Sequence, residues 1–268
     1  MHTVSRRHLL KALSTVPLSL VGWRPTVAAL APPHTVLLKL DDVQEHRRGG
    51  LPSAWSRVRD FIRHEGLAAS FGVIGESLEN PSPAYVEALR EIGRDERFEL
   101  WNHSYLNKFV PNAAAGETAA HVGTSAEAQF DAISRTQYLI QTRLGVSSQI
   151  FGPHASATDD NTYRALARIP EIRAVWFYGP KRPDTTSLPV FKREANLEHP
   201  LFSPSLAGLQ ADLGAHPPTA PYLGLQGHPD MWGDDRFQAF VDVCRWLVDQ
   251  GCTFACPSAY LRTSKGRL

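Results

Sequence analysis

Short apolar segments alternate with longer amphipathic segments along most of the chain, and this alternation limits the possible folds more than any other feature. The short segments, which predict β-strands, cover residues 35–40, 69–74, 98–101, 149–151, 174–178, 222–226 and 253–256. The longer segments, which predict helices, cover residues 54–64, 83–92, 126–144, 162–169 and 237–248. Strands and helices that alternate in this way indicate an α/β fold with a mostly parallel sheet, either open or closed into a barrel.

Two stretches depart from this alternation. Residues 112–124 are rich in alanine and glycine and have no clear period, so we predict a loop there. Residues 179–221 are irregular and rich in proline, which favours an excursion of loops, with room for a hairpin, over a second domain. We therefore expect residues 30–268 to form a single domain.

Carboxylates and histidines follow directly after four of the predicted strands. Asp41 and Asp42 end the first strand, and His103, His154 and His228 follow three later ones. In a parallel α/β barrel all such positions lie on one rim, which is the rim that carries active sites. We therefore expect these side chains to meet in one pocket, the alternative being that they only cap helices and fill surface turns.

The segment that contains His103 also has the spacing of metal ligands. Asn107 lies four positions after His103, and side chains four positions apart on a helical turn share one face. An imidazole nitrogen and an amide oxygen can then point at the same ion. The alternative is a histidine at a strand end that only hydrogen-bonds a neighbouring carbonyl.

The first 29 residues resemble an export signal. They contain the twin-arginine sequence SRRHLLK at 5–11, a modest apolar run at 12–21, and small residues at 27–29. The apolar run is too short, and too interrupted by Pro17, to span a bilayer permanently. We predict a twin-arginine signal peptide at 1–29, use of the twin-arginine export machinery, cleavage after Ala29, and a periplasmic or extracellular protein with no stable membrane span.

Charge and cysteine content narrow the possible partners. The chain has 28 Lys and Arg residues against 27 Asp and Glu residues, and this balance argues against nucleic acid as a partner. Its three cysteines, Cys244, Cys252 and Cys256, lie close together near the C-terminus, and an odd number cannot all pair. We predict small buried thiols, with a Cys252–Cys256 disulfide as the alternative.

Four motifs in this order resemble those of the polysaccharide deacetylases, the NodB-homology or carbohydrate esterase family 4 proteins. They are LKLDDV, WNHSYLN, FGPHAS and LQGHPDMW, and the resemblance extends over residues 35–261. The resemblance implies a distorted (β/α) barrel of about seven strands. It also implies that Asp41 is the general base, that Asp42 and His103 bind a metal ion, and that His228 protonates the leaving amine.

The chain departs from the family pattern in two motifs. Asn107 stands where the family has a second histidine ligand, so zinc should bind less tightly, and either the altered site still works or another group completes it. Gly152 stands where an arginine that holds the base is expected. We take His154 as the candidate for completing the metal site, for orienting Asp41 or for lining the pocket, with simple turn packing as the alternative.

The resemblance implies a metal-dependent hydrolase of carbon–nitrogen bonds that deacetylates an N-acetylated sugar of a glycan. Zinc is the favoured ion, with manganese or cobalt as alternatives. Pro153, Trp101 and Trp232 are the remaining candidates for substrate contacts, although both tryptophans could equally be packing residues. The alternatives are an amidohydrolase that acts on a small amide or ureide, and a carbohydrate-binding relative that has lost the metal.

Overall fold

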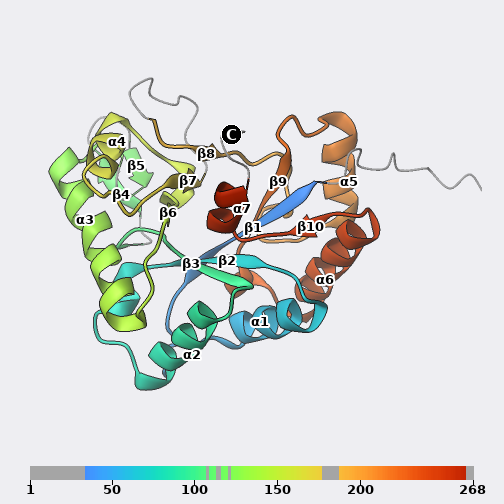
Figure 1. Cartoon of the computed structure of the whole chain (residues 1–268), viewed down its shortest axis with the longest axis horizontal. Coiled ribbons are helices and arrows are strands. Elements are labelled where there is room, and N and C mark those ends of the chain that lie inside the picture. Colours follow the sequence, from blue (N-terminus) through green and yellow to red (C-terminus); the bar gives the residue numbers. More distant parts are fainter. Residues whose placement is uncertain (1–33, 107–108, 113–115, 120–121, 177–186, 264–268) are drawn as a thin grey trace, which may run out of the picture.

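The fold is known from a computed structural model that describes residues 34–106, 109–112, 116–119, 122–176 and 187–263. Eight of its strands form one parallel sheet: β1 (Thr35–Val43), β2 (Ala69–Val73), β3 (Phe98–Asn102), β6 (Ile150–Phe151), β7 (Ala174–Trp176), β8 (Val190–Phe191), β9 (Tyr222–Gly227) and β10 (Thr253–Phe254). The strands curve into a barrel with helices around its outside (Figure 1).

The longer helices are α1 (Ser53–Glu65), α2 (Pro83–Arg94), α3 (Ala126–Leu139), α5 (Leu206–Ala215) and α6 (Asp234–Asp249). Shorter helices are α4 (Asp160–Leu166) and α7 (Pro257–Thr263), and a π-helical turn, η2 (Ile140–Leu144), extends α3. Helix α1 ends at Gly66. The φ of Gly66 is 65°, a left-handed conformation that glycine adopts without steric penalty. The described helices include none with the length and hydropathy needed to cross a membrane.

The two faces of the barrel strands differ in a way that follows from the alternation of side chains along a strand. On β1, Val36, Leu38 and Leu40 pack outward against the helices, whereas Leu37 points inward into a second cluster. That inner cluster also contains Trp101, Ile150, Ala174, Trp176, Phe191, Tyr222 and Tyr260. Lys39 and Asp41 occupy the next inward positions of β1, so the inside of the barrel changes from apolar to charged toward the carboxyl ends of the strands.

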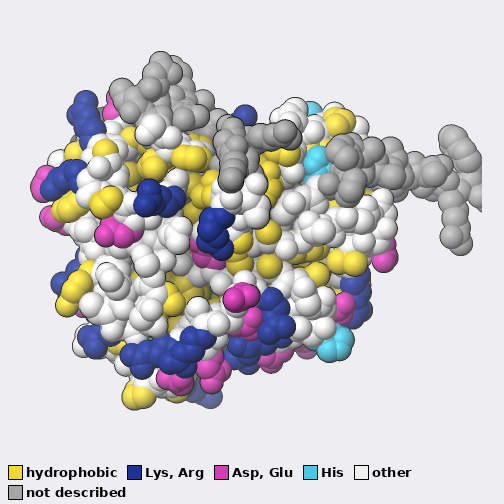
Figure 2. Space-filling model, viewed as in Figure 1, with side chains coloured by type: hydrophobic (Ala, Val, Ile, Leu, Met, Phe, Trp, Pro, Cys, Tyr) yellow, Lys and Arg dark blue, Asp and Glu magenta, His cyan; other side chains and the backbone are white. Residues whose placement is uncertain are grey.

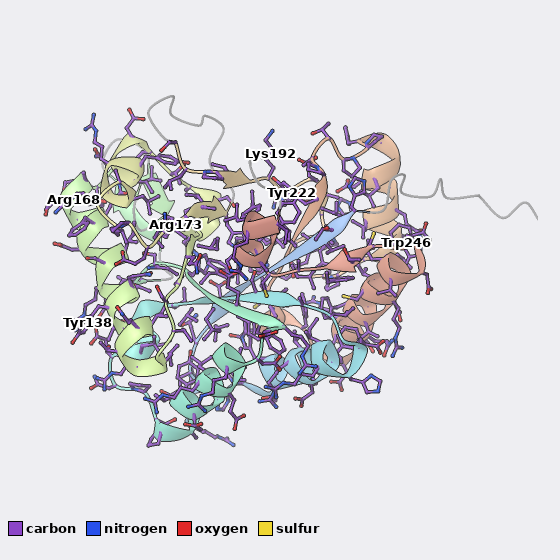
Figure 3. The ribbon with its side chains drawn as sticks, in the orientation of Figure 1. Tyr138, Arg168, Arg173, Lys192, Tyr222 and Trp246 are labelled. Atoms are coloured by element: carbon purple, nitrogen blue, oxygen red, sulfur yellow. The ribbon has the colours of Figure 1, made fainter. Side chains whose placement is uncertain are left out.

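Helix α7 closes the barrel at the opposite end from these charges. Tyr260 of α7 packs against Tyr222, the first residue of β9, with ring centroids 5.5 Å apart, and Figure 3 shows Tyr222 beside this helix. The segment after β8 reaches the first half of β9, because Glu194 N–H donates to the Gly224 carbonyl at 3.3 Å. Helix α7 therefore covers the end of the barrel where β9 begins, and the charged side chains of β1 lie toward the other end.

Charged side chains of both signs are mixed on the outer surface that α1 and α2 form. Figure 2 shows lysine and arginine side chains interspersed with aspartate and glutamate along this edge. Arg63 on α1 forms an ion pair with Asp95, the residue after α2, with 2.9 Å between Nε and Oδ2. This ion pair links the two helices.

The (β/α) barrel is confirmed, and so are the positions of the long elements, but two local predictions were wrong. The region expected to be a loop after residue 112 contains β5 (Gly116–Ala119), which pairs with β4 (Phe109–Asn112) in an antiparallel hairpin. The excursion expected at 179–221 contains β8 and α5 in addition to loops. Cys244, Cys252 and Cys256 are all buried and free, as predicted, so the alternative Cys252–Cys256 disulfide is absent.

Candidate metal and catalytic site

The adjacent carboxylates of Asp41 and Asp42 reach the same pocket because β1 is irregular where it ends. Neighbouring residues of a regular strand point to opposite faces. Asp42, however, has a φ of 73°, and the pairing of β1 with β2 shifts register between Leu40 and Val43. Both carboxylates consequently lie beside His103, whose Nε2 atom is 3.2 Å from Asp42 Oδ1 and 3.7 Å from Asp41 Oδ2.

His103 follows β3 and is almost completely buried, at 1% exposure. Its Nδ1 atom lies 2.6 Å from the Gly152 carbonyl oxygen. Because a carbonyl can only accept, Nδ1 carries the proton and Nε2 is left to face the carboxylates. An imidazole lone pair that faces a carboxylate binds either a proton or a metal ion, so this arrangement suits a cation.

The turn after β3 is held by the residue before His103. Asn102 is buried, and its side chain accepts a hydrogen bond from the Ser104 N–H at 2.9 Å and donates one to the Ile133 carbonyl at 2.9 Å. Ser104 has a φ of 65°, a conformation that is uncommon outside glycine. The asparagine therefore stabilises a strained turn that aims His103 into the barrel.

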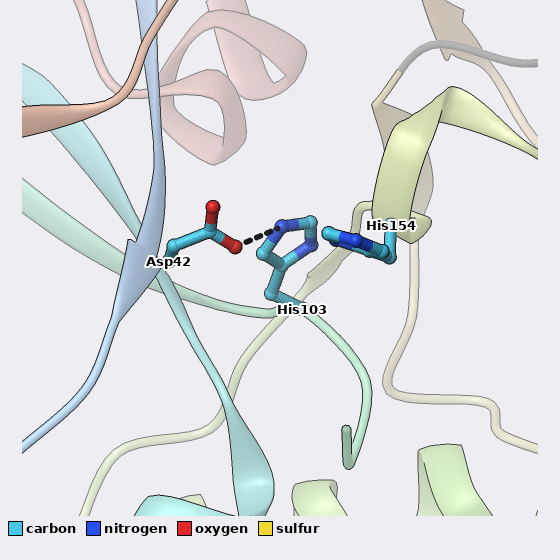
Figure 4. Close-up of side chains that lie close together, drawn as sticks. All are labelled: Asp42, His103 and His154. Atoms are coloured by element: carbon cyan, nitrogen blue, oxygen red, sulfur yellow. Dashed lines mark ion pairs between the residues drawn. The ribbon is translucent and has the colours of Figure 1, made fainter. Parts of the chain in front are cut away.

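His154 joins Asp42 and His103 in a possible three-ligand metal site. One ligand atom from each of these residues lies within 4.8 Å of the others, and Figure 4 shows the His103 ring between the Asp42 carboxylate and His154. Strand pairing explains the meeting, because Asn102 of β3 is in register with Phe151 of β6, so the residues that follow the two strands emerge side by side. Asn107 lies outside the described residues.

The donor set fits a divalent cation such as zinc. Zinc binds imidazole nitrogen and carboxylate oxygen at about 2.0–2.2 Å, and two histidines with one carboxylate leave a position for water or substrate. Asp42 Oδ1 is buried and accepts no hydrogen bond from the described residues, so this oxygen is available to bind a metal ion. Burial lowers the pKa of His154, which favours the neutral imidazole that a metal requires.

The carboxyl group of Asp42 is strongly acidic. Burial alone would raise its pKa, but the adjacent His103 ring, whose Nε2 atom lies 3.2 Å from Oδ1, lowers it more, to about 2. Asp42 is thus an anion across the physiological range, as a metal ligand must be.

His228 follows β9 and approaches Asp41 from the other side of the pocket. Its Nε2 atom lies 3.9 Å from Asp41 Oδ2, and its Nδ1 atom lies 2.8 Å from Glu198 Oε2. Burial lowers the pKa of His228, but the hydrogen bond to Glu198 and the charges of Asp41 and Glu198 raise it more, so the pKa lies above its ordinary value. The imidazole can therefore carry a proton near neutral pH, and Nε2 presents it to the pocket.

Glu198 was not predicted as a site residue. It is buried and accepts four hydrogen bonds: from the His228 N–H at 2.9 Å, the His228 ring at 2.8 Å, the Trp232 indole at 2.8 Å and the Phe202 N–H at 3.1 Å. Its position within the irregular, proline-rich stretch gave no periodic signal. A charged residue in a loop becomes recognisable only when the fold brings that loop beside β9.

No family model matches the sequence, and no curated protein does so either. The structure matches the Xyl-CE4 domain of a multidomain xylanase from the hindgut metagenome of Trinervitermes trinervoides, with a TM-score of 0.59 and 19% identity over 87% of this chain and 91% of that one. A family 4 acetyl xylan esterase from Clostridium thermocellum in complex with cobalt gives 0.57 and 15% over 85% and 90%. A peptidoglycan deacetylase from Bacillus subtilis gives 0.57 and 15% over 88% and 94%.

The chain has the carbohydrate esterase family 4 fold. The resemblance drawn from the four motifs is thereby confirmed for the architecture. A family 4 pseudoenzyme from Bacillus anthracis shares the fold as well, with a TM-score of 0.58 and 13% identity over 86% of this chain and 66% of that one. The fold alone therefore does not distinguish an enzyme from a pseudoenzyme, and only the residues of the site can do so.

Within this family 4 fold, two residues hold Asp41. Lys39 Nζ donates to Asp41 Oδ2, and Gln226 Nε2 donates to the same oxygen at 2.7 Å. Gly152, where the arginine was expected, has no room for any side chain, because a Cβ atom there would lie 2.3 Å from the Trp101 ring. The geometry favours His154 as a metal ligand over the alternative that it orients Asp41.

Of the two alternatives for Trp101 and Trp232, the structure favours packing over contact with a sugar. Trp101 is fully buried inside the family 4 barrel, and Trp232 is 3% exposed, stacks on Phe240 and gives its indole N–H to Glu198. Neither ring offers a face to a substrate. Pro153 is also buried and places His154 at the turn after β6.

A pocket of about 250 Å³ opens beside His228. Its lining includes Gln226, Glu198, Arg193 and Asn196 in addition to His228. The pocket thus borders both the residue that would donate a proton and the residue that holds Asp41, and a group bound in it would lie next to the reacting centre.

Proposed function

We propose that the protein is a divalent-metal-dependent hydrolase that removes acetyl groups from N-acetylated sugars of a glycan. The observation that carries this proposal is the position of Asp41. Its carboxylate lies between His103 of the metal-ligand cluster and His228, with 3.7 and 3.9 Å to their Nε2 atoms. The proposed base thus lies beside both the proposed acid and the candidate cation site.

The charges of the site support metal dependence. Asp41, Asp42 and Glu198 carry three negative charges, and Lys39 carries one positive charge. With His103 and His154 neutral and His228 protonated, one negative charge remains, which favours binding of a cation. Burying uncompensated charge is costly, so the cation would also stabilise the fold around it.

Asp42, His103 and His154 would hold the ion, which supplies a Lewis acid that polarises the acetyl carbonyl. Asp41, whose Oδ2 atom lies 3.7 Å from His103 of this cluster, takes a proton from the water that attacks the carbonyl carbon. His228 then gives the proton on Nε2 to the departing amine, while Glu198 fixes the ring through Nδ1. An amine is a poor leaving group until it is protonated, so the raised pKa of His228 serves this step.

The proposal is tested by acetate release from chitin oligomers and peptidoglycan fragments, together with the metal content of the protein. We expect about one equivalent of divalent metal per chain, loss of metal in Asp42→Ala and His103→Ala, and retained metal without turnover in His228→Ala. His64→Ala, at an exposed histidine, is the matched control and should change neither. Equal loss of metal from all three site variants would contradict the assignment of roles.

Two further substrates decide between neighbouring activities. Release of acetate from acetylated xylan alone would indicate an O-acetyl esterase, and hydrolysis of small amides or ureides alone would indicate an amidohydrolase. A protein that binds chitin oligomers but neither binds metal nor releases acetate would be a carbohydrate-binding relative.

We also propose that residues 1–29 direct twin-arginine export of the protein to the periplasm or beyond. The support is the paired Arg6 and Arg7 before a short apolar run. Replacing both with lysine should retain the precursor inside the cell. Unchanged export of that variant would refute the proposal.

A further inference from the structure

Lys39 is a cation in the interior of the barrel. It occupies the inward position of β1 between Leu37, which belongs to the inner apolar cluster, and Asp41. Its exposure is 0%, although lysine is among the residues least often buried. The segment TVLLKLDD shows the same anomaly in sequence, as one lysine in an otherwise apolar strand.

The surroundings of Lys39 fix where its ammonium group lies. The Nζ atom lies 4.9 Å from the centre of the Trp101 ring and donates to Asp41 Oδ2. Trp101 cannot move aside, because its ring passes so close to Gly72 and Gly152 that a Cβ at either position would lie 2.4 or 2.3 Å away. The indole ring therefore forms a fixed cation–π contact with the ammonium group.

Asp41 Oδ2 receives its second hydrogen bond from a different strand. Gln226 of β9 donates from Nε2 at 2.7 Å, while its Oε1 accepts from Arg193 Nη1 at 3.2 Å, which sets the orientation of the amide. Lys39 and Gln226 are in register across β1 and β9. Because the two donors approach one oxygen from two strands, the carboxylate cannot rotate without losing both bonds.

A buried ion pair such as that between Lys39 and Asp41 does not by itself indicate that the lysine stabilises the fold. An apolar side chain of similar volume often serves a buried position equally well, because both charges of a pair must be removed from water. Burial lowers the pKa of Lys39, and the charges of Asp41 and Asp42 together with the hydrogen bond to Asp41 oppose that fall. A buried lysine that shares one carboxylate oxygen of Asp41 with Gln226 therefore points to a role in positioning that carboxylate.

We propose that Lys39 is a positioning residue for the reaction, whose ammonium group locks the carboxylate of Asp41 in the orientation that proton abstraction requires. The expected effect of Lys39 on kcat rests on the proposed function, whereas its effect on the orientation of Asp41 rests on the structure alone. Trp101 supports the lysine, and Gln226 completes the clamp.

The kinetic test compares Lys39→Met with the wild type in acetate release. Misplacement of a reacting group by about 1 Å costs on the order of 100-fold in rate, so kcat should fall by about that factor while KM changes less than about threefold. Metal content should be unchanged. Lys192→Met, at an exposed lysine, is the matched control and should behave as the wild type.

Chemical rescue separates positioning from structural damage. In Lys39→Ala, ethylammonium can enter the space of the side chain and donate to Asp41, whereas tetramethylammonium has no N–H to donate. We expect partial recovery of kcat with ethylammonium alone. A kcat within about threefold of wild type in Lys39→Met, or activity lost together with metal and not rescued, would overturn the proposal.

A crystallographic comparison decides the geometry even if no acetate is released from any substrate. In that case the proposed function fails, but the orientation of Asp41 in wild type and Lys39→Met can still be compared. We expect the carboxylate to rotate in the variant, and an unchanged orientation would overturn the proposal. Lys39→Gln, which is one bond shorter and can retain a water molecule, is measured by the same criteria if the methionine variant does not fold.

Discussion

Replacing Glu198 by glutamine tests its hydrogen bond to the Nδ1 atom of His228. Oε1 of Glu198 accepts from the His228 N–H and the Trp232 indole, and Oε2 accepts from the Phe202 N–H and the His228 ring. Glutamine has the same shape but only one acceptor oxygen. Its amide nitrogen would have to take the place of Oε2 and face the Phe202 N–H.

The magnitude of the effect follows from this mismatch. The partly buried Phe202 N–H loses its acceptor, which costs about 1–3 kcal/mol. In a protein of this size 1 kcal/mol corresponds to a change in Tm of about 2–4 °C, so Tm should fall by roughly 2–12 °C. The amide also favours the neutral ring with its proton on Nε2, so kcat should fall by about 100-fold through loss of the acid.

The stability difference should depend on pH in one direction only. The pKa of His228 is raised in the folded protein by Glu198 and Asp41, which outweigh its burial. A histidine of this kind stabilises the fold fully below its unfolded pKa of about 6.5, and this contribution is lost as the pH rises through the higher folded pKa. Glu198→Gln lacks most of the contribution. The difference in Tm between the two proteins should therefore be larger near pH 6 than near pH 9.

The measurement is thermal unfolding of the metal-free proteins, followed by circular dichroism, at both pH values. Glu127→Gln provides the matched control, because Glu127 makes only an exposed pair with Arg168, and its loss should change stability by less than about 1 kcal/mol. NMR titration of the His228 ring gives an independent reading. A difference in Tm that is the same at both pH values, or larger at the alkaline one, would refute the coupling of Glu198 to His228.

Three further predictions concern the metal site and its support. His154→Ala should weaken zinc binding more than Asn107→Ala does, as measured by competition with a chelating dye; the reverse order would assign the third ligand to Asn107. Gly152→Ala should lower the free energy of unfolding by about 1–3 kcal/mol, because the new methyl group meets Trp101, and denaturant unfolding measures this. Zinc at 100 times its Kd should stabilise the wild type by about 2.7 kcal/mol but leave the Tm of Asp42→Ala unchanged.

The sequence predicted the elements whose signal is local and periodic. Helix α1 was expected at 54–64 and found at Ser53–Glu65, because its apolar face repeats every third or fourth residue and Gly66 ends it. The rim residues Asp41, His103 and His228 were found together for a related reason. Each follows a parallel strand, and topology alone brings such positions to one end of the barrel.

What the sequence did not reveal depends on contacts between distant segments. Helix α5 has no strong apolar face and β8 has two residues, so neither carries a readable period. Glu198 acquires its role only when its loop packs beside β9. Lys39 is different, since a lysine at an inward position of an apolar strand is visible in the sequence and could have been recognised as a buried partner for Asp41.

The conformation of Asp42 explains how two adjacent carboxylates can differ in role. A regular β1 would send Asp42 outward, to the side on which Val36, Leu38 and Leu40 pack in the apolar core. A φ of 73° returns it to the pocket, at a strain of about 1–3 kcal/mol that aspartate tolerates better than most residues. Asp41, which keeps the regular inward direction, is held by Lys39, whereas Asp42 is free to face His103. The irregular end of β1 thus gives one dipeptide two different carboxylates, a fixed one that is the proposed base and one that faces the proposed metal site.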